Sequence, residues 1–191
     1  MQFTTTPLFG GAITVRLPST YTDASQIRQI PSHQEVYLDS GGYSSIVTEI
    51  LEYVDEPSDE AALQYHFADL VDGCGDETSV VDDDEQKGVV RMERLPNNPV
   101  RTLTFLQTPP TPPSHPTRKT PEFTYIHLLL LRLKDQATDI IIQINTPHYA
   151  NEYEKPSEAG AETELMRESK AVRDEILKSF EIREWGLFGG E

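Results

Sequence analysis

Two nearly continuous apolar segments, separated by only four residues, constrain the fold more than any other feature of this chain. Residues 123–133 and 138–144 are dominated by Leu and Ile, and the polar connector at 134–137 suits an antiparallel hairpin. A strand that is apolar at nearly every position has no polar face to give to solvent. The pair therefore predicts two central strands of a sheet that is covered on both faces.

Other periodicities place further elements around this hairpin. Residues 8–18 predict a short hairpin or bent strand, because Gly10-Gly11 permits a tight bend between β-branched segments. Further strands are expected at residues 36–38, 80–81, 89–92 and 100–106, and apolar spacing predicts helices at residues 44–54, 59–70 and 161–180. Trp185, Leu187 and Phe188 are expected to fold back as a terminal anchor. Together these elements indicate one α/β (α+β) domain over residues 1–191, with a mainly antiparallel sheet and helices on both faces.

Two segments have the composition of insertions into that domain. Residues 72–88 are rich in Asp, Glu and Gly and have few apolar side chains to pack. Residues 107–121 contain six prolines, which favour an extended chain. We expect an acidic loop and a Pro-rich loop at these positions.

The charge distribution constrains the class of partner. The chain has 16 Lys and Arg against 32 Asp and Glu, and neither Lys nor Arg occurs between Arg28 and Lys87. A field of this sign repels phosphate backbones and anionic membranes and attracts a basic protein surface. The sequence has no run of about 18 apolar residues that would cross a bilayer. We therefore expect no nucleic-acid partner and no membrane insertion.

Motifs for catalysis and metal binding are sparse. The sequence has neither a phosphate-binding P-loop nor a nucleophile elbow, and its single cysteine, Cys74, supplies no disulfide framework or structural zinc site. His66 and Asp69 would share a face of the predicted helix at 59–70, where a core-edge histidine is favoured over a catalytic one. Glu49, Glu52 and Glu56 would form an acidic face on the predicted helix at 44–54 and the residues that follow it before Pro57. No cofactor or metal is expected.

The chain resembles the Ran guanine-nucleotide release factors of the Mog family. The specific element is R-Q-I-P-S-H-Q-E-V at residues 28–36, which follows L-F-G-G-A-I at residues 8–13 with the family's spacing. The resemblance continues through residues 46–52, 65–70 and 138–147, then the terminal helix and Leu187-Phe188. It implies a Mog/PsbP-like fold and a non-catalytic regulator that binds the small GTPase Ran and promotes nucleotide release in nuclear protein import.

Further expectations follow from this resemblance. Ran is the implied partner, a Ran co-regulator is a second candidate, and a monomer in the nucleus and cytoplasm is expected. Nucleotide exchange and simple sequestration of Ran are both compatible with it. The candidate Ran-binding residues are Asp23, Ser25, Arg28, Gln34, Glu35, Glu49 and Glu52.

Several of these residues could have a structural role instead of a role in binding Ran. The family pattern has an acid where this chain has Ser32, which leaves Asp23 and Glu35 as the better candidates. Asp23 with Ser25 could cap a turn, Arg28 with Gln29 could brace the loop, and Glu35 could be a solvated carboxylate at a strand edge.

Two other function classes stay open from the sequence. One is an interaction adaptor of the same fold for a different protein, such as a channel in trafficking or a chromatin factor. The other is a small hydrolase that uses His66 and Asp69.

Overall fold

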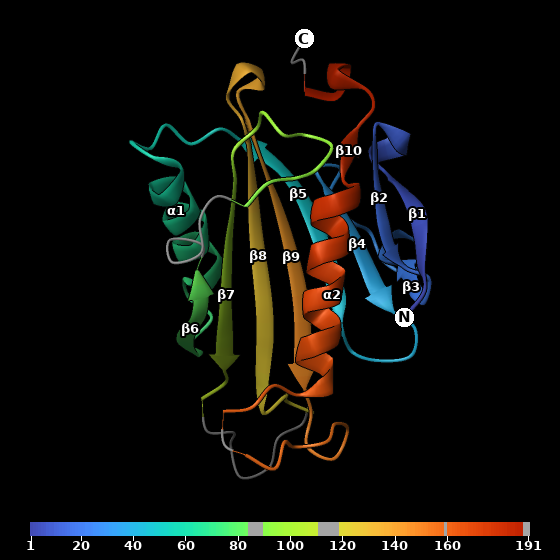
Figure 1. The fold of residues 1–191 in the computed structure, drawn as a ribbon, viewed down its shortest axis with the longest axis vertical. Helices are drawn as coiled ribbons and strands as arrows, with labels where there is room; N and C mark the ends of the chain where they lie inside the picture. The colour runs from blue at the N-terminus through green and yellow to red at the C-terminus, as the bar shows by residue number, and fades with distance from the viewer. Residues whose placement is uncertain (84–89, 111–118, 159, 189–191) are drawn as a thin grey trace.

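Two antiparallel sheets and two helices make up the fold (Figure 1). The computed structural model describes residues 1–83, 90–110, 119–158 and 160–188. The larger sheet has the strand order β3-β4-β5-β9-β8-β7-β6, and the smaller has the order β1-β2-β10. The strands of the larger sheet are β3 (Tyr21–Asp23), β4 (Gln34–Asp39), β5 (Ser45–Glu52), β6 (Glu77–Asp83), β7 (Val100–Thr108), β8 (Phe123–Leu133) and β9 (Thr138–His148). The other elements are β1 (Phe3–Leu8), β2 (Ile13–Pro18), β10 (Glu181–Ile182), α1 (Asp59–Val71) and α2 (Glu164–Ser179), with short 3-10 turns η1 (Phe9–Gly11), η2 (Ala24–Gln26), η4 (Lys134–Gln136) and η5 (Trp185–Phe188).

The predicted central hairpin is confirmed as β8 and β9, which pair from Phe123 opposite His148 to Leu133 opposite Thr138. Successive leucines of β8 alternate between two cores. Leu129 packs in the core formed with α2 and the small sheet, whereas Leu130 packs in the core formed with α1. The expected coverage of both faces is therefore confirmed.

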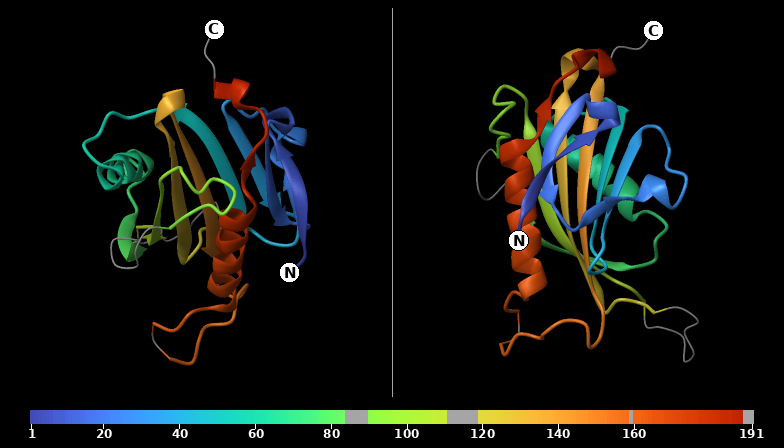
Figure 2. Two further views of the ribbon diagram at one scale, coloured as in Figure 1. Left: turned by 45° about the horizontal axis from the view of Figure 1, so that its top comes forward. Right: turned by 90° about the vertical axis from the view of Figure 1, so that its right-hand side faces the viewer.

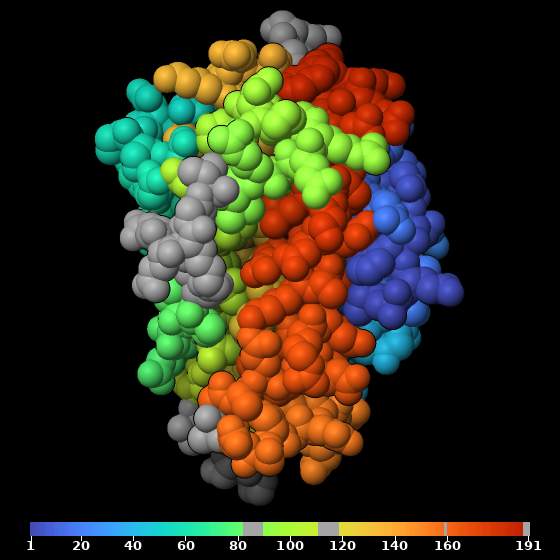
Figure 3. All heavy atoms as spheres, in the orientation of Figure 1, coloured from blue at the N-terminus to red at the C-terminus, as the bar shows by residue number. Residues whose placement is uncertain are grey.

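Each face of the large sheet is covered by different elements. Helix α2 lies along one face beside the small sheet, and Figure 3 shows it occupying much of the front of the molecule. Helix α1 packs against β7 and β8 on the other face, and Figure 2 gives two further views of this layering. Among the described residues, neither helix is both long and apolar enough to cross a bilayer.

Local sequence explains where the two helices begin. The Ser58 side chain accepts a hydrogen bond from the Ala61 amide, and Asp59 and Glu60 occupy the first turn of α1. The Thr163 side chain accepts one from the Met166 amide at the start of α2. The predicted helices at 59–70 and 161–180 are thus confirmed, with α2 beginning slightly later than expected.

The helix predicted at residues 44–54 is wrong, because the segment forms strand β5. Ile46 and Ile50 are four residues apart, a spacing that puts two side chains on one face in a helix and in a strand alike. Pairing decides the outcome: β5 lies between β4 and β9, and Ile46, Thr48 and Ile50 face the core against β9. The acidic face expected on that helix does not exist.

Two further expectations need correction. Residues 90–92 form no strand beyond a single bridge from Val90 to Val100, although Met92 is completely buried, and Val89 lies outside the described residues. The strand expected at residues 80–81 is confirmed as part of β6, but β6 lies within 72–88, the segment expected to be an acidic loop, because its backbone pairs with β7 even though Val80 and Val81 stay exposed. Residues 84–88 of this loop and 111–118 of the Pro-rich loop lie outside the described part of the chain.

The hairpin expected at residues 8–18 is confirmed at its bend and its second strand, β2, but its first strand, β1, lies before that segment at Phe3–Leu8, and the C-terminal segment adds a third strand. Strands β1 and β2 pair through η1, and β10 adds to the other edge of β2, with Glu181 opposite Thr14. Leu187 and Phe188 pack against the core, as the expected terminal anchor requires, whereas Trp185 is exposed.

Candidate functional site

The predicted site residues lie on two neighbouring stretches of backbone. Asp23 ends β3, Ser25 belongs to η2 and Arg28 lies in the loop that follows, whereas Gln34 and Glu35 open β4. Glu49 and Glu52 lie on the adjacent strand β5. The fold therefore brings all seven positions to the β3–β5 side of the large sheet.

Glu35 is held by the turn between β1 and β2. Its Oε1 accepts a hydrogen bond of 2.6 Å from the Phe9 backbone N–H. Burial raises the pKa of Glu35 above its ordinary value, the Phe9 hydrogen bond opposes that rise, and the nearby Asp23 carboxylate adds to it. Glu35 is thus a half-buried carboxylate with one oxygen already engaged, rather than a freely solvated one.

Tyr37 lies on the same face of β4 as Glu35. It holds the end of β1, next to the turn. Its hydroxyl donates to the Pro7 carbonyl at 3.2 Å. Burial, followed by the carboxylates of Glu35 and Asp23, raises the pKa of Tyr37 to about 12. The hydroxyl therefore keeps the proton that it donates.

Asp23 and Ser25 form a capped turn. One Asp23 carboxylate oxygen accepts from the Ser25 amide at 2.8 Å, and the other accepts from the Ser25 hydroxyl at 2.6 Å. The capping alternative is therefore confirmed for this pair. Ser25 shapes the loop through Asp23.

The tip of the same loop is exposed. Ile27 has 77% of its surface open to solvent, and Arg28 is also exposed. The Arg28 backbone N–H donates to Ala24, but its guanidinium forms no ion pair with any residue that the structure describes. Bracing of this loop by the Arg28 side chain is therefore not observed.

Gln34 and Glu49 lie on the opposite sheet face from Glu35. They are cross-strand partners in the β4–β5 register, and the Gln34 side-chain amide donates to the Glu49 carboxylate. Glu52, three residues further along β5, is on the other face and exposed. Glu49 and Glu52 therefore do not act as one patch.

His66 belongs to a buried network that the sequence pattern did not reveal. Its Nε2 lies 2.9 Å from the Asp139 carboxylate, which also accepts from Arg132 and from the Val54 amide. Asp69, its expected partner, is exposed on α1. Only the packing of α1 against the large sheet brings His66 to Asp139 on β9, so no local spacing could have indicated it.

Chemistry of other kinds has little support at these positions. No group of three or more His, Cys, Asp or Glu side chains able to hold a metal occurs in the described ranges. Cys74 is exposed, and its thiol donates to the Val71 carbonyl at 3.0 Å. The arrangement around Glu35 can bind and orient a partner, but it offers no paired nucleophile and base.

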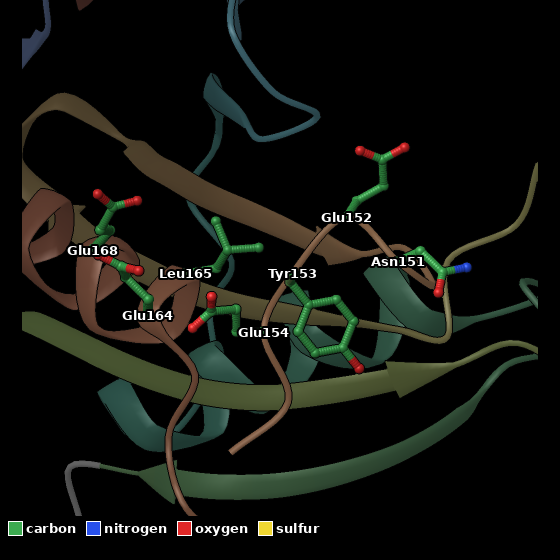
Figure 4. Close-up of a pocket in the computed structure, with 7 residues that line it drawn as sticks. All are labelled: Asn151, Glu152, Tyr153, Glu154, Glu164, Leu165 and Glu168. Atoms are coloured by element: carbon green, nitrogen blue, oxygen red, sulfur yellow. The ribbon is translucent and has the colours of Figure 1, made fainter. Parts of the chain in front are cut away.

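A cleft that the sequence did not indicate lies at the other end of the large sheet. It has a volume of about 510 Å³ and is formed by the loop after β9 and the first turns of α2. Figure 4 shows Glu152, Glu154, Glu164 and Glu168 around it, with Leu165 and Tyr153 between them. In Figure 1 this loop lies at the bottom, whereas the turn between β1 and β2 lies at the top. The cleft is therefore separate from the Glu35 region.

Comparisons with known proteins agree with the fold and with the quoted motifs. The sequence model of a family described as "Ran-interacting Mog1 protein" matches residues 6–147. The chain is 29% identical to the Ran guanine nucleotide release factor of Danio rerio, over 96% of this chain and 98% of that one. It is 31% identical to the nuclear import protein mog1 of Schizosaccharomyces pombe, over 73% and 75% of the two chains.

Solved structures give the same result at the level of the fold. The crystal structure of the Saccharomyces cerevisiae Ran-binding protein Mog1p superposes with a TM-score of 0.72 at 25% identity, covering 99% of this chain and 100% of that one. A structure of a Mog1 point mutant gives a TM-score of 0.71 at 24% identity. From the matched segment and these relatives together, we conclude that the chain belongs to the family of Ran-interacting Mog1 proteins.

Proposed function

We propose that this protein binds the small GTPase Ran and promotes release of its guanine nucleotide, in support of nuclear protein import. We place it in the nucleus and cytoplasm, as a regulator that makes and breaks no covalent bond. Relatives over most of the chain are named as Ran guanine nucleotide release factors or nuclear import proteins. The observation that carries the proposal is the half-buried Glu35 carboxylate, which the R-Q-I-P-S-H-Q-E-V element presents at the start of β4.

The edge position of this element suits a protein partner. Strand β3 pairs with β4 only at Tyr37, Leu38 and Asp39, so the first residues of β4 have β5 on one side and no described strand on the other. Gln34 and Glu35 point to opposite faces of β4 at this free edge. A partner that docks on the edge can therefore contact both side chains, with Asp23 and Arg28 on the loop beside them.

Charge favours a basic partner at this edge. Loop 24–33, β4, β5 and α1 contain no Lys or Arg apart from Arg28. Carboxylates at Asp23, Glu35 and Glu52 therefore act with no positive side chain from these elements to screen them, other than that of Arg28. Such a field speeds encounter with a positively charged surface and orients it.

Nucleotide release follows from differential binding. A partner shifts an equilibrium only as far as it prefers one state, so this protein must bind nucleotide-free or loosened Ran more tightly than loaded Ran. A thousandfold weakening of nucleotide affinity corresponds to about 4 kcal/mol of coupling, and the coupling is reciprocal. Carboxylates of this protein that compete for the Ran cations holding the nucleotide phosphates would favour the nucleotide-free state of Ran.

The direct test is a release assay with labelled nucleotide on Ran. The wild-type protein should accelerate release, and Glu35→Lys should lower that acceleration by about tenfold or more, because a like charge then faces a basic surface. Glu154→Lys is the matched control. It makes the same change in net charge at an exposed position beside the distant cleft and should leave the acceleration unchanged.

Other results of the release assay would contradict either the proposed function or the proposed site. Unchanged off-rates and no complex with Ran at low ionic strength would contradict the proposed function, and capture of a different protein would favour the adaptor. Full activity of Glu35→Lys, with an active wild type, would contradict the site and leave the function standing.

A further inference from the structure

The turn between β1 and β2 has an unusual backbone. Phe9, Gly10 and Gly11 have φ values of 49°, 68° and 97°, three consecutive residues in the left-handed region. A bulky residue such as Phe rarely adopts this conformation, and strain of this kind is typical of functional segments. A Cβ on Gly10 or Gly11 would meet no atom within 4 Å, so glycine is required here by the backbone conformation and not by crowding.

Contacts from distant parts of the chain hold this turn. The preceding residue, Leu8, provides no side-chain cap, and the Phe9 N–H donates instead to Glu35 on β4. On the other side, the Ala12 carbonyl accepts from the Arg183 and Glu184 amides at 2.8 and 3.1 Å. The turn is thus fixed between the candidate partner-binding strand and the C-terminal segment.

The two Glu35 oxygens have different environments. Oε1 is committed to Phe9, whereas Oε2 accepts no hydrogen bond from any residue that the structure describes. One end of the carboxylate can therefore hold the turn while the other meets a partner. Because Gly10 is exposed, the turn that Glu35 holds lies at the surface.

We infer that Glu35 is a positioning residue for the Phe9–Gly11 turn, and that this turn is itself part of the partner-binding surface. The inference rests on the proposed function for the identity of the partner, Ran. Loss of Glu35 then has two effects, removal of a charge and release of the turn, and different substitutions separate them.

Hydrogen exchange of the Phe9 amide, measured by NMR, tests the positioning role without Ran. Glu35→Gln keeps an acceptor oxygen and should keep the Phe9 amide protected. In Glu35→Ala the Phe9 amide should exchange about tenfold faster or more, because its N–H loses the acceptor on residue 35. Equal protection in Glu35→Ala and wild type would overturn the positioning role. Thermal unfolding of each variant shows that the fold is retained.

Ran titrations test the role of the turn in binding while Glu35 stays intact. Gly10→Ala strains the turn and should weaken Ran binding by about tenfold. Gly75→Ala is the matched control, because Gly75 also has a left-handed φ, 74°, with nothing within 4 Å of an added Cβ, and it lies in the loop after α1. Its Ran affinity should equal that of the wild type.

The outcomes separate the inference from the proposed function. Equal Ran affinities of Gly10→Ala and wild type, with Glu35→Lys still impaired, would overturn the role of the turn and leave the function intact. An absence of binding by the wild type would overturn the proposed function and with it the turn's part in the surface. The amide exchange comparison would still decide whether Glu35 positions Phe9.

Discussion

His127 is the residue whose environment differs most from water. It is fully buried on β8, its Nδ1 lies 2.8 Å from the Thr104 hydroxyl, and its Nε2 has no hydrogen-bond partner in the described structure. Burial, followed by the positive charges of Arg173 and Lys170 on α2, lowers the pKa of His127 from 6.5 to about 3. The folded protein therefore keeps this imidazole neutral at pH values where the unfolded chain protonates it.

This difference predicts a loss of stability in acid. Below pH 6.5 the unfolded state binds one proton more than the folded state, so the free energy of unfolding should fall by about 1.4 kcal/mol per pH unit until the pH nears the folded pKa. The paired variant Thr104→Val/His127→Leu removes the titrating group together with the hydroxyl that would be left unpaired. Urea unfolding at several pH values should show a correspondingly flatter profile for this variant, and parallel profiles would contradict the assignment.

At the scale of elements, one hydrogen-bond chain joins the end of β9 to the start of α2. His148 Nε2 lies 2.7 Å from the Thr163 hydroxyl, and the same hydroxyl accepts from the Met166 amide at 3.0 Å. His148 Nδ1 lies 3.0 Å from the Thr146 carbonyl, so the neutral ring donates there and accepts from Thr163. Burial lowers the pKa of His148, in agreement with a neutral ring.

Thr163→Ala should therefore cost more than an ordinary helix cap. The loss of the cap contributes about 1 kcal/mol, and the buried imidazole nitrogen left unpaired adds about 1–3 kcal/mol. Ser58→Ala at the start of α1 is the matched control and should cost about 1 kcal/mol, because the exposed Ser58 side chain bonds to the Ala61 amide and to the Glu60 carboxylate, both in the first turn of the helix. Urea unfolding measures both, and equal losses would show that His148 does not depend on Thr163.

Elements whose identity follows from local signals were predictable. The β8–β9 hairpin follows from its continuous apolar segments, and α1 and α2 follow from their caps and apolar spacing. Strand β5 was not predictable, because the spacing of Ile46 and Ile50 fits a helix and a strand alike. Only pairing with β4 and β9 decides between the two. The two residues of β10 carry no strand signal of their own, so their addition to β2 could not be read locally.

The same distinction applies to the candidate site. The positions of Asp23 and Glu35 could be proposed from the motif, and the Asp23–Ser25 cap from their spacing. The hydrogen bond from Phe9 to Glu35 joins residues 26 apart, one in the turn between two strands of the small sheet and the other on the large sheet, and the separation of Glu49 from Glu52 depends on β5 being a strand. Both are consequences of tertiary structure.

For the whole molecule, the segment of the sequence without Lys or Arg and the mixed-charge helix α2 lie on different sides of the fold. No Lys or Arg occurs in four elements, β4, β5, α1 and β6. One of them, α1, covers a face of the large sheet. Helix α2, on the opposite face, carries positive side chains among its acids, namely Arg167, Lys170, Arg173 and Lys178. The molecule therefore has one strongly acidic side, where Arg101 of β7 pairs with Glu60 of α1, and one side of mixed charge.

Association with Ran should consequently depend on salt. Between about 0.01 M and about 0.15 M ionic strength the Debye length falls from about 30 to about 8 Å, so the association rate should fall by about tenfold while the dissociation rate changes little. Stopped-flow measurements check both rates. Glu35→Lys should reduce this salt dependence and Glu154→Lys should not, whereas a rate independent of salt would contradict electrostatic steering.

The order β1-β2-β10 also has a consequence for biosynthesis. The hairpin of β1 and β2 shares a sheet with a strand that follows α2, and the Ala12 carbonyl finds its two donors only when residues 183 and 184 have left the ribosome. Glu35 can reach Phe9 much earlier, because only 26 residues separate them. A nascent chain can therefore assemble half of the support for this turn before the segment after α2 has been made, so the proposed Ran-binding surface matures only when that segment has emerged.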